Sequence, residues 1–389
     1  MRLSQDVYLS VSYFLLWSVV GFFYPYFPLF LASLGLDGTQ IGIALGILPL
    51  HTIFTPLIWG YLADRTKRRT ELYVLALAGG LLANVAFLFI PSSFGIVITA
   101  MFVVGAFLPA LGPMLDAITL AYVKQTGKDF GHIRHWGAFG FVASSLLMGW
   151  IIRQTHVLAM FYGLILLLAI QIPLGFTLPK IESDGQGLRS KDTIELIRDR
   201  RVLWFLGFCF LYGIGYSSYL VGYTLFLRDL RLPTNLIGAA WAFGGVTEIV
   251  LIYFSVRLYK KVGAFNMLLL CVLATMTRWT AHLFIDGVVP VFAVQALHAF
   301  TFGGFLVASQ LLITEIIKPE LKSTGQALFF AVFIGVGGVI GHALFGRLLD
   351  LFGTRQQFGF AAGVLVVSLL PLLVFRLYDR HRYRPATVA

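Results

Sequence analysis

Long apolar runs follow one another along almost the whole chain, and only short polar connections separate them. About 20 apolar residues in a helix cover the hydrocarbon core of a bilayer, so runs of this length are typical of membrane spans. The composition agrees, because 58% of the 389 residues are hydrophobic and 12% are charged, against about 25% charged in soluble domains. The sequence therefore predicts an all-α membrane protein with twelve transmembrane helices.

The runs form two sets of six. The predicted helices are 7–33, 39–62, 71–91, 95–122, 132–153 and 157–178 in the first set, and 202–227, 235–257, 265–284, 288–315, 322–348 and 356–377 in the second. Transporters of this size commonly pack two similar halves around a central substrate path. We therefore predict an N-terminal half (1–179), a cytoplasmic linker (180–201) and a C-terminal half (202–389).

The linker contains the longest polar stretch of the chain. Its last part, SKDTIELIRDR, has the pattern of a short amphipathic helix with Ser190 or Asp192 as the cap. About 22 of the 29 Lys and Arg residues lie in the linker, the tails and the even-numbered connections, which predicts that both termini are cytoplasmic in an inner-membrane protein. The net charge of +11 then follows from topology rather than from binding nucleic acid.

The N-terminal segment MRLSQDVYLSVSYFLLW leads into a full-length span without a small-residue cleavage site, so we expect a retained helix rather than a signal peptide. Cys209 and Cys271 lie in separate apolar runs and predict no disulfide. His132 and His135 have a spacing that metal sites use, but the start of a cytoplasmic helix explains them better. We expect no metal, and no catalytic constellation of an enzyme is present in the sequence.

Five ionisable residues lie inside the apolar runs, namely Asp116, Arg134, Glu248, Arg278 and His298. A charge at a helix centre costs about 3 kcal/mol on insertion scales, so each residue needs a reason to be there. They come from five different predicted helices and nearly neutralise one another if they converge. The pattern predicts a polar transport pathway. The alternative is a set of ion pairs that only fixes helix packing, with an interfacial arginine at the fifth helix.

The segment GYLADRTKRR, residues 60–69, connects the second and third predicted helices and resembles the loop that marks the major facilitator superfamily. In that family the acidic residue, here Asp64, pairs across a helix end and latches one conformation, while a glycine, here Gly60, permits close helix contact. The resemblance places Arg65 and Arg68 in the same latch. The alternative is a basic loop that only follows the orientation rule.

A more specific resemblance lies in PMLDA, which holds Asp116, and FGHIRHWGAFGF, which holds Arg134 and Phe141. Both look like the fourth and fifth helices of the lactose permease type of oligosaccharide:proton symporter, in which the acid and the arginine form a substrate-holding pair. Glu248 and His298 match residues that this family uses for substrate contact and proton movement. Arg278 matches the arginine of the same group.

Two departures from the sugar transporters change the expected cargo. Phe141 stands where they carry a tryptophan that stacks on the sugar, and Thr301 stands where they carry the proton-bearing glutamate. The motifs are more similar to the 3-phenylpropionate permease branch, which implies a small aromatic carboxylate. Glu248 or Asp116 then has to carry the proton.

A carboxylate inside a cavity needs a cation, which Arg134 or Arg278 supplies, and Phe141 offers a ring face. Three tyrosines are further ring candidates, with helix packing as the alternative: Tyr212, Tyr216 and Tyr219. We therefore expect a symporter that works by alternating access with the proton as coupling ion. The self-contained halves predict a monomer, and no feature of the sequence requires another cofactor. A sugar, oligosaccharide or nucleoside symporter and an uncoupled facilitator remain open.

Overall fold

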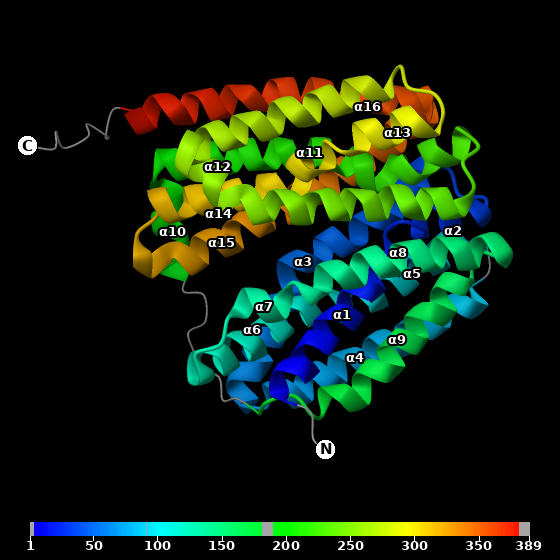
Figure 1. Ribbon diagram of the computed structural model, residues 1–389, viewed down its shortest axis with the longest axis horizontal. Helices are drawn as coiled ribbons and strands as arrows, with labels where there is room; N and C mark the ends of the chain where they lie inside the picture. The colour runs from blue at the N-terminus through cyan, green and yellow to red at the C-terminus, as the bar shows by residue number, and fades with distance from the viewer. Residues whose placement is uncertain (1–3, 91, 181–189, 381–389) are drawn as a thin grey trace, which may run out of the picture.

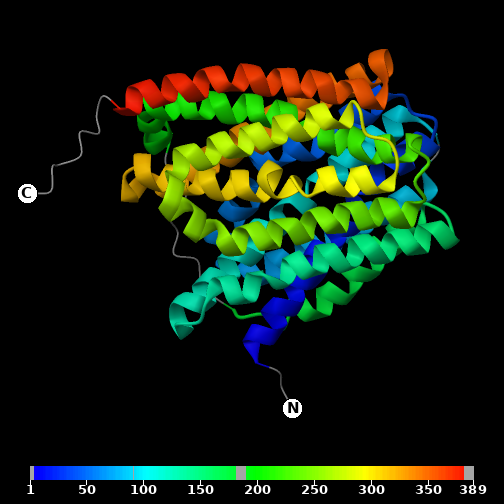
Figure 2. The ribbon, with the colours of Figure 1, turned by 45° about the horizontal axis from the view of Figure 1, so that its top comes forward.

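The computed structural model describes residues 4–90, 92–180 and 190–380, and the described chain is helical from end to end without a strand. The predicted tails at residues 1–3 and 381–389, and the predicted cap at Ser190 or Asp192, lie outside the described residues and side chains. The helices form one elongated bundle in which the N-terminal half lies beside the C-terminal half (Figures 1 and 2). The predicted all-α membrane fold is confirmed.

The N-terminal half contains six apolar spans, several of them broken into two helices. They are α1 and α2 (Gln5–Phe23, Phe27–Ser33), α3 (Gly38–Thr66), α4 and η1 (Arg69–Ala86, Phe87–Phe89), α5 and α6 (Phe94–Gly105, Leu108–Thr126), α7 and α8 (Phe130–Arg134, Trp136–Gln154), and α9 (Ala159–Gly175). Proline explains the first break: Pro25 lies between α1 and α2, and a proline has no N–H to continue the hydrogen-bond ladder.

The C-terminal half begins after the short helix α10 (Ser190–Arg198), which falls within the predicted linker. Its elements are α11 (Arg200–Asp229), α12 (Thr234–His282), α13 (Val288–Gln295), η2 (Phe300–Gly304), α14 (Phe305–Ile316), η3 (Pro319–Leu321), α15 (Lys322–Phe330), η4 (Ala331–Val336) and α16 (Gly337–Arg380). The elements η2 and η4 are π-helical turns, which occur often at functional sites.

Two glycines divide the two longest helices into separate spans. Gly263 has φ 78° inside α12, and Gly353 has φ 88° inside α16. A positive φ is costly for residues with a Cβ, so glycine permits these single-residue turns. Counting the parts on either side separately, the described residues hold the predicted twelve spans.

The two halves are joined at one end of the bundle. We call this the distal end; it carries the connections around Asp37, Thr155 and Asp286, and the opposite basic end carries Arg65 and Lys260. In Figure 1 the ribbons run close together at the distal end and spread toward the basic end, where α6 and α7 lie on one side and α10 and α15 on the other.

The first seam at the distal end joins α3 to α16. Asp350 caps the first turn of α3, because its carboxylate accepts hydrogen bonds from Gly38 N at 2.5 Å and from Thr39 N at 2.8 Å. Further along the seam, a Cβ placed on Gly42 would lie 2.7 Å from Gly346 Cα. The backbones of the two halves therefore touch directly, as is typical of small-residue interfaces between membrane helices.

The second seam joins α8 to α12 at the same end. Arg153 donates to Asn235 Oδ1 at 3.1 Å, and the Thr234 hydroxyl donates to the carbonyl of Gly149 at 3.2 Å. The same two helices also pack closely further along, since a Cβ on Gly245 would lie 3.1 Å from the Phe141 ring. The side-chain bonds at the helix ends can break and re-form while each half keeps its own packing.

Candidate functional site

In the N-terminal half the structure brings Asp116 and Arg134 together. Arg134 Nε lies 3.3 Å from Asp116 Oδ1, and the Tyr13 hydroxyl of α1 donates to the same oxygen at 2.7 Å. The side chains of Arg134 and Asp116 are 43% and 33% exposed. One carboxylate oxygen thus receives both donors, while much of the guanidinium remains accessible to another anion.

Aromatic rings line the approach to this pair. The guanidinium carbon of Arg134 lies 5.6 Å from the ring centroid of Trp17, within range of a cation–π interaction. A Cβ on Gly137 would lie only 2.4 Å from Trp17 Cδ1, so the glycine lets α8 approach the indole. Phe141 is partly buried one turn further along α8. The pair and these rings form what we call the N-terminal cluster: Tyr13, Trp17, Asp116, Arg134 and Phe141.

In the C-terminal half, Arg278 is fully buried and both of its terminal nitrogens have partners. It lies 2.9 Å from His298 Nδ1, and it donates to Gln295 Oε1 at 2.5 Å and to Thr301 Oγ1 at 3.3 Å. Within the described residues, Nε is the one side-chain nitrogen of Arg278 that lacks a partner. Arg278 therefore holds neighbouring side chains rather than presenting a free fork to solvent.

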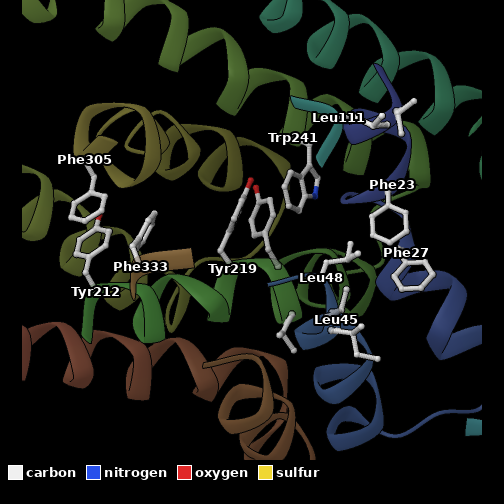
Figure 3. Close-up of a cluster of buried hydrophobic side chains, with 14 of the residues drawn as sticks. Phe23, Phe27, Leu45, Leu48, Leu111, Tyr212, Tyr219, Trp241, Phe305 and Phe333 are labelled. Atoms are coloured by element: carbon white, nitrogen blue, oxygen red, sulfur yellow. The ribbon is translucent and has the colours of Figure 1, made fainter. Parts of the chain in front are cut away.

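Three rings surround the Arg278 guanidinium. Its carbon lies 4.5 Å from the centroid of Tyr219, 4.6 Å from that of Trp279 and 5.7 Å from that of Tyr223. Tyr219 in turn packs against Trp241 with ring centroids 4.5 Å apart, and Figure 3 shows the two rings side by side. This aromatic box keeps water from the cation and fixes its direction.

His298 connects Arg278 to Glu248. A guanidinium nitrogen can only donate, so His298 Nδ1 accepts and the ring proton is on Nε2. Nε2 lies 3.3 Å from Glu248 Oε1, within ion-pair distance. The backbone N–H of Gly303 donates to the same oxygen at 3.2 Å. Within the described residues, Glu248 Oε2 makes no hydrogen bond, so it is the atom available to a proton.

The turn η2 places these groups. Gly303 lies within it, and a Cβ there would come within 3.3 Å of the Glu248 side chain. Thr301, in the same turn, accepts from Arg278 and donates to the carbonyl of Leu297 at 3.3 Å. The threonine thus extends the network around the arginine. We call Glu248, Arg278, Gln295, His298 and Thr301 the C-terminal cluster.

Two of the three candidate tyrosines are buried supports of the C-terminal cluster. Tyr212 donates to the carbonyl of Thr301 at 2.8 Å and stacks on Phe305 at 3.8 Å between centroids (Figure 3). Tyr219 covers Arg278, as described above. Tyr216 is partly buried and stacks on Phe302 at 5.3 Å. Their positions favour the packing alternative for Tyr212 and Tyr219.

Two consecutive glycines of α12 separate the two clusters. A Cβ on Gly245 would lie 3.1 Å from the Phe141 ring, while one on Gly244 would lie 2.7 Å from the His298 ring. Phe141 therefore lies at the seam between the halves. Any shift of α8 along α12 changes the environment of both clusters.

The residues of the predicted latch lie at the connection between α3 and α4. Asp64 pairs with Arg69 at 3.0 Å across this connection, and Arg65 and Arg68 are exposed. Among the residues that the structure describes, none comes within 4 Å of a Cβ placed on Gly60. A latch role for these residues remains a prediction.

Sequence reasoning missed three residues of the two clusters. Tyr13 and Trp17 are four apart and share one face of α1, but aromatic residues in an apolar run resemble ordinary core. Gln295 is three residues before His298 on the same helical face. Its amide donates to Tyr219 Oη at 3.1 Å and to the carbonyl of Ala240 at 3.0 Å. An isolated amide in an apolar run is the signal that would have revealed it.

Twelve spans in two halves, with a pair of charged side chains inside spans of the N-terminal half and a buried arginine in the C-terminal half, define a multi-pass membrane transporter. The chain belongs to the MFS_1 like family, whose model matches residues 7–360. Its fold is similar to that of the nucleoside transporter NupG, with a TM-score of 0.85 and 17% identity over 98% of this chain and 100% of that one.

Two relatives differ in the cargo that they carry. The maltose permease of Geobacillus stearothermophilus is 26% identical over 374 residues, which cover 95% of this chain and 94% of that protein. The probable 3-phenylpropionic acid transporter of Escherichia coli (strain K12) is 27% identical over 362 residues, which cover 91% and 93%. The protein is therefore a transporter of the major facilitator type for a small molecule.

Proposed function

We propose that the protein is a proton-coupled symporter that imports a small aromatic carboxylate, such as 3-phenylpropionate, by alternating access. The observation that carries the proposal is the position of Arg134, a partly exposed cation beside Asp116 and the Trp17 ring. A guanidinium binds a carboxylate through two parallel hydrogen bonds. The neighbouring indole and the Phe141 ring offer faces to an aromatic group. The 3-phenylpropionic acid relative supports the same cargo class.

Arg134 is a better receptor for a carboxylate than Arg278. The sequence alone could not distinguish between these two arginines. Arg278 is fully buried and already bound to three side chains, so a substrate would have to displace them. Arg134 shares one oxygen of Asp116 with Tyr13 and keeps donors for another anion. The N-terminal cluster is the proposed substrate site.

Glu248 is the proposed proton carrier. Its Oε1 accepts a hydrogen bond from Gly303 N and lies 3.3 Å from His298 Nε2, so a proton on Oε2 leaves both contacts in place. Protonation removes the negative charge from a site of low dielectric beside the seam, which lowers the cost of moving the halves. Thr301 stands where the sugar transporters carry an acid, so Glu248 takes the whole role here.

The two seams provide the moving element. The bonds of Asp350 to α3 and of Arg153 to Asn235 hold the distal end closed. With both termini cytoplasmic in the inner membrane, the distal end faces outside and this conformation faces inward. Breaking the two seams while the basic end closes, including the loop at Asp64, gives the outward-facing state. One chain supplies both clusters and both seams, so one monomer is sufficient.

A sugar symporter is the second candidate, and the maltose permease relative favours it. Asp116 accepts hydrogen bonds and would bind sugar hydroxyls, while Trp17 would stack on the ring. The clusters then keep their roles, and only the cargo differs. An uncoupled facilitator would keep the same binding site without a proton moving at Glu248.

The test is the pH of a weakly buffered suspension of cells that express the protein, on addition of 3-phenylpropionate, maltose or a nucleoside. The proposal expects alkalinisation with the aromatic acid only, absent from Glu248→Gln cells. A signal with maltose instead would transfer the assignment to the sugar. Radiolabelled uptake without any pH change would reject proton coupling.

A further inference from the structure

A charged cavity lies at the basic end, away from both clusters. It has a volume of about 660 Å³ between α10, the start of α11, the connection after α14 and the end of α16. Its charged lining residues are Glu195, Arg198, Asp199, Arg200, Arg201 and Lys318. Four cations therefore face two acids. Figure 1 shows α10 at the outer end of the C-terminal half, beside α15.

Both acids of the cavity already hold a cation. Glu195 accepts from Lys318 Nζ at 2.8 Å, and its carboxylate raises the pKa of that lysine. Asp199 accepts from Arg201 NH2 at 2.9 Å and from the Arg201 backbone N–H at 2.9 Å. The first pair ties α10 to the connection after α14. Neither acid is left to neutralise the remaining arginines.

Arg198 and Arg200 supply the excess charge. Both are exposed, and within the described part of the chain neither side chain makes a hydrogen bond or an ion pair. They stand at the end of α10 and the start of α11, on either side of Asp199. Two guanidinium groups that line one cavity form a receptor for an anion with several oxygen atoms.

The apolar residues around the cavity place it at the depth of lipid headgroups. Leu196 of α10 is buried, whereas Ile194 and Ile197 are 52% and 45% exposed. On α11, Leu203 is 50% exposed one turn after Arg200, where the membrane span begins. An amphipathic helix with exposed apolar residues lies in the membrane interface. Tyr378 of α16 also lines the cavity, as expected of an interfacial aromatic residue.

We propose that this cavity binds a phosphate-bearing anion, the headgroup of an anionic phospholipid, between Arg198 and Arg200. A lipid headgroup and a soluble phosphate would both place a phosphate between the two guanidinium groups. In the lipid, the acyl chains would run past Ile194 and Leu203. Basic cavities between membrane helices at the cytoplasmic surface are suited to such headgroups. The bound lipid would brace the linker helix α10 against the C-terminal half.

Native mass spectrometry of the detergent-purified full chain measures the binding directly, with dioleoyl-phosphatidylglycerol as the probe and dioleoyl-phosphatidylcholine as the uncharged comparison. In Arg198→Gln/Arg200→Gln the phosphatidylglycerol affinity is expected to fall about tenfold or more. The matched control Lys260→Gln/Lys261→Gln removes the same charge from another exposed site at the basic end and should change it less than about twofold. Arg198→Lys/Arg200→Lys keeps both charges without the planar forks and should lose less binding than the Gln variant.

Inorganic phosphate separates the two sources of the anion. If phosphate alone raises the melting temperature of the wild type but not of Arg198→Gln/Arg200→Gln, and phosphatidylglycerol is not preferred, the site holds a soluble phosphate. Equal binding of the two lipids without a phosphate effect would overturn the proposal. So would an equal loss of phosphatidylglycerol binding in both double variants, because that would indicate general surface charge.

Discussion

Each half of the molecule has an arginine inside an apolar span and an acidic residue near it, but the two arginines differ in what they can bind. The side chain of Arg134 is 43% exposed and contacts Asp116 directly. Arg278 is fully buried and contacts His298, which in turn lies beside Glu248. The same side chain is thus open to a ligand in one half and a fixed part of a network in the other. Burial and occupied terminal nitrogens, not the presence of charge, separate Arg278 from the accessible Arg134.

The first prediction tests the structural role of Arg278. Arg278→Met leaves acceptors of His298 and Gln295 unpaired inside the protein, which costs about 3 kcal/mol or more. The expected result is a loss of several degrees in the melting temperature of purified protein. Arg134→Met is the matched variant and should cost less than about 1 kcal/mol, because its pair is partly exposed. Equal losses in the two variants would contradict the comparison.

The second prediction tests the binding role of Arg134. Arg134→Lys keeps the charge but removes the planar fork, so we expect kcat/KM for uptake of the aromatic acid to fall about 50-fold. Labelled uptake in cells checks this. Arg257→Lys, on an exposed arginine beside Phe254, serves as the control and should leave uptake unchanged. Uptake that survives Arg134→Lys would move the substrate site elsewhere.

The fold could be predicted from the sequence because a long apolar run in a bilayer satisfies its backbone hydrogen bonds as a spanning helix. The helix ends fell within a few residues of the predicted ranges, and only the tight joins at Gly263 and Gly353 were unexpected. A single glycine with positive φ can replace a connection of several residues. The polar residues near each join, such as Lys260 and Asp350, predict a connection but not that a single glycine makes the turn.

The site was predictable only where a side chain is anomalous in its run. Asp116 and Glu248 stand out as charges in apolar sequence, and the structure places each beside a basic partner. Trp17 does not stand out, since aromatic residues are ordinary in membrane helices. The pairing of Asp64 with Arg69 instead of Arg68 depends on how the loop closes after Lys67, which has φ 56°. These features are decided by tertiary contacts rather than by local pattern.

The third prediction tests whether the Trp17 ring contacts the substrate. Trp17→Leu removes the ring beneath Arg134, and with it a cation–π interaction of about 1 kcal/mol and a stacking face. We expect KM for the aromatic acid to rise about fivefold with a smaller change in kcat. Trp150→Leu, on a tryptophan that is 58% exposed, is the control. If both variants behave alike, Trp17 serves helix packing rather than the ligand.

We propose that the N-terminal cluster binds the substrate and the C-terminal cluster binds the proton. The most direct test of this proposal compares exchange with accumulation in proteoliposomes, because exchange of labelled for unlabelled substrate needs the binding site but no net proton movement. Glu248→Gln keeps an oxygen for the hydrogen bond from Gly303 and for the contact with His298, while removing the titrating group. The account predicts exchange within about threefold of wild type, with no accumulation driven by a pH gradient. If Glu248→Gln loses both exchange and accumulation, or if it still accumulates substrate in response to a pH gradient, the proposal is contradicted.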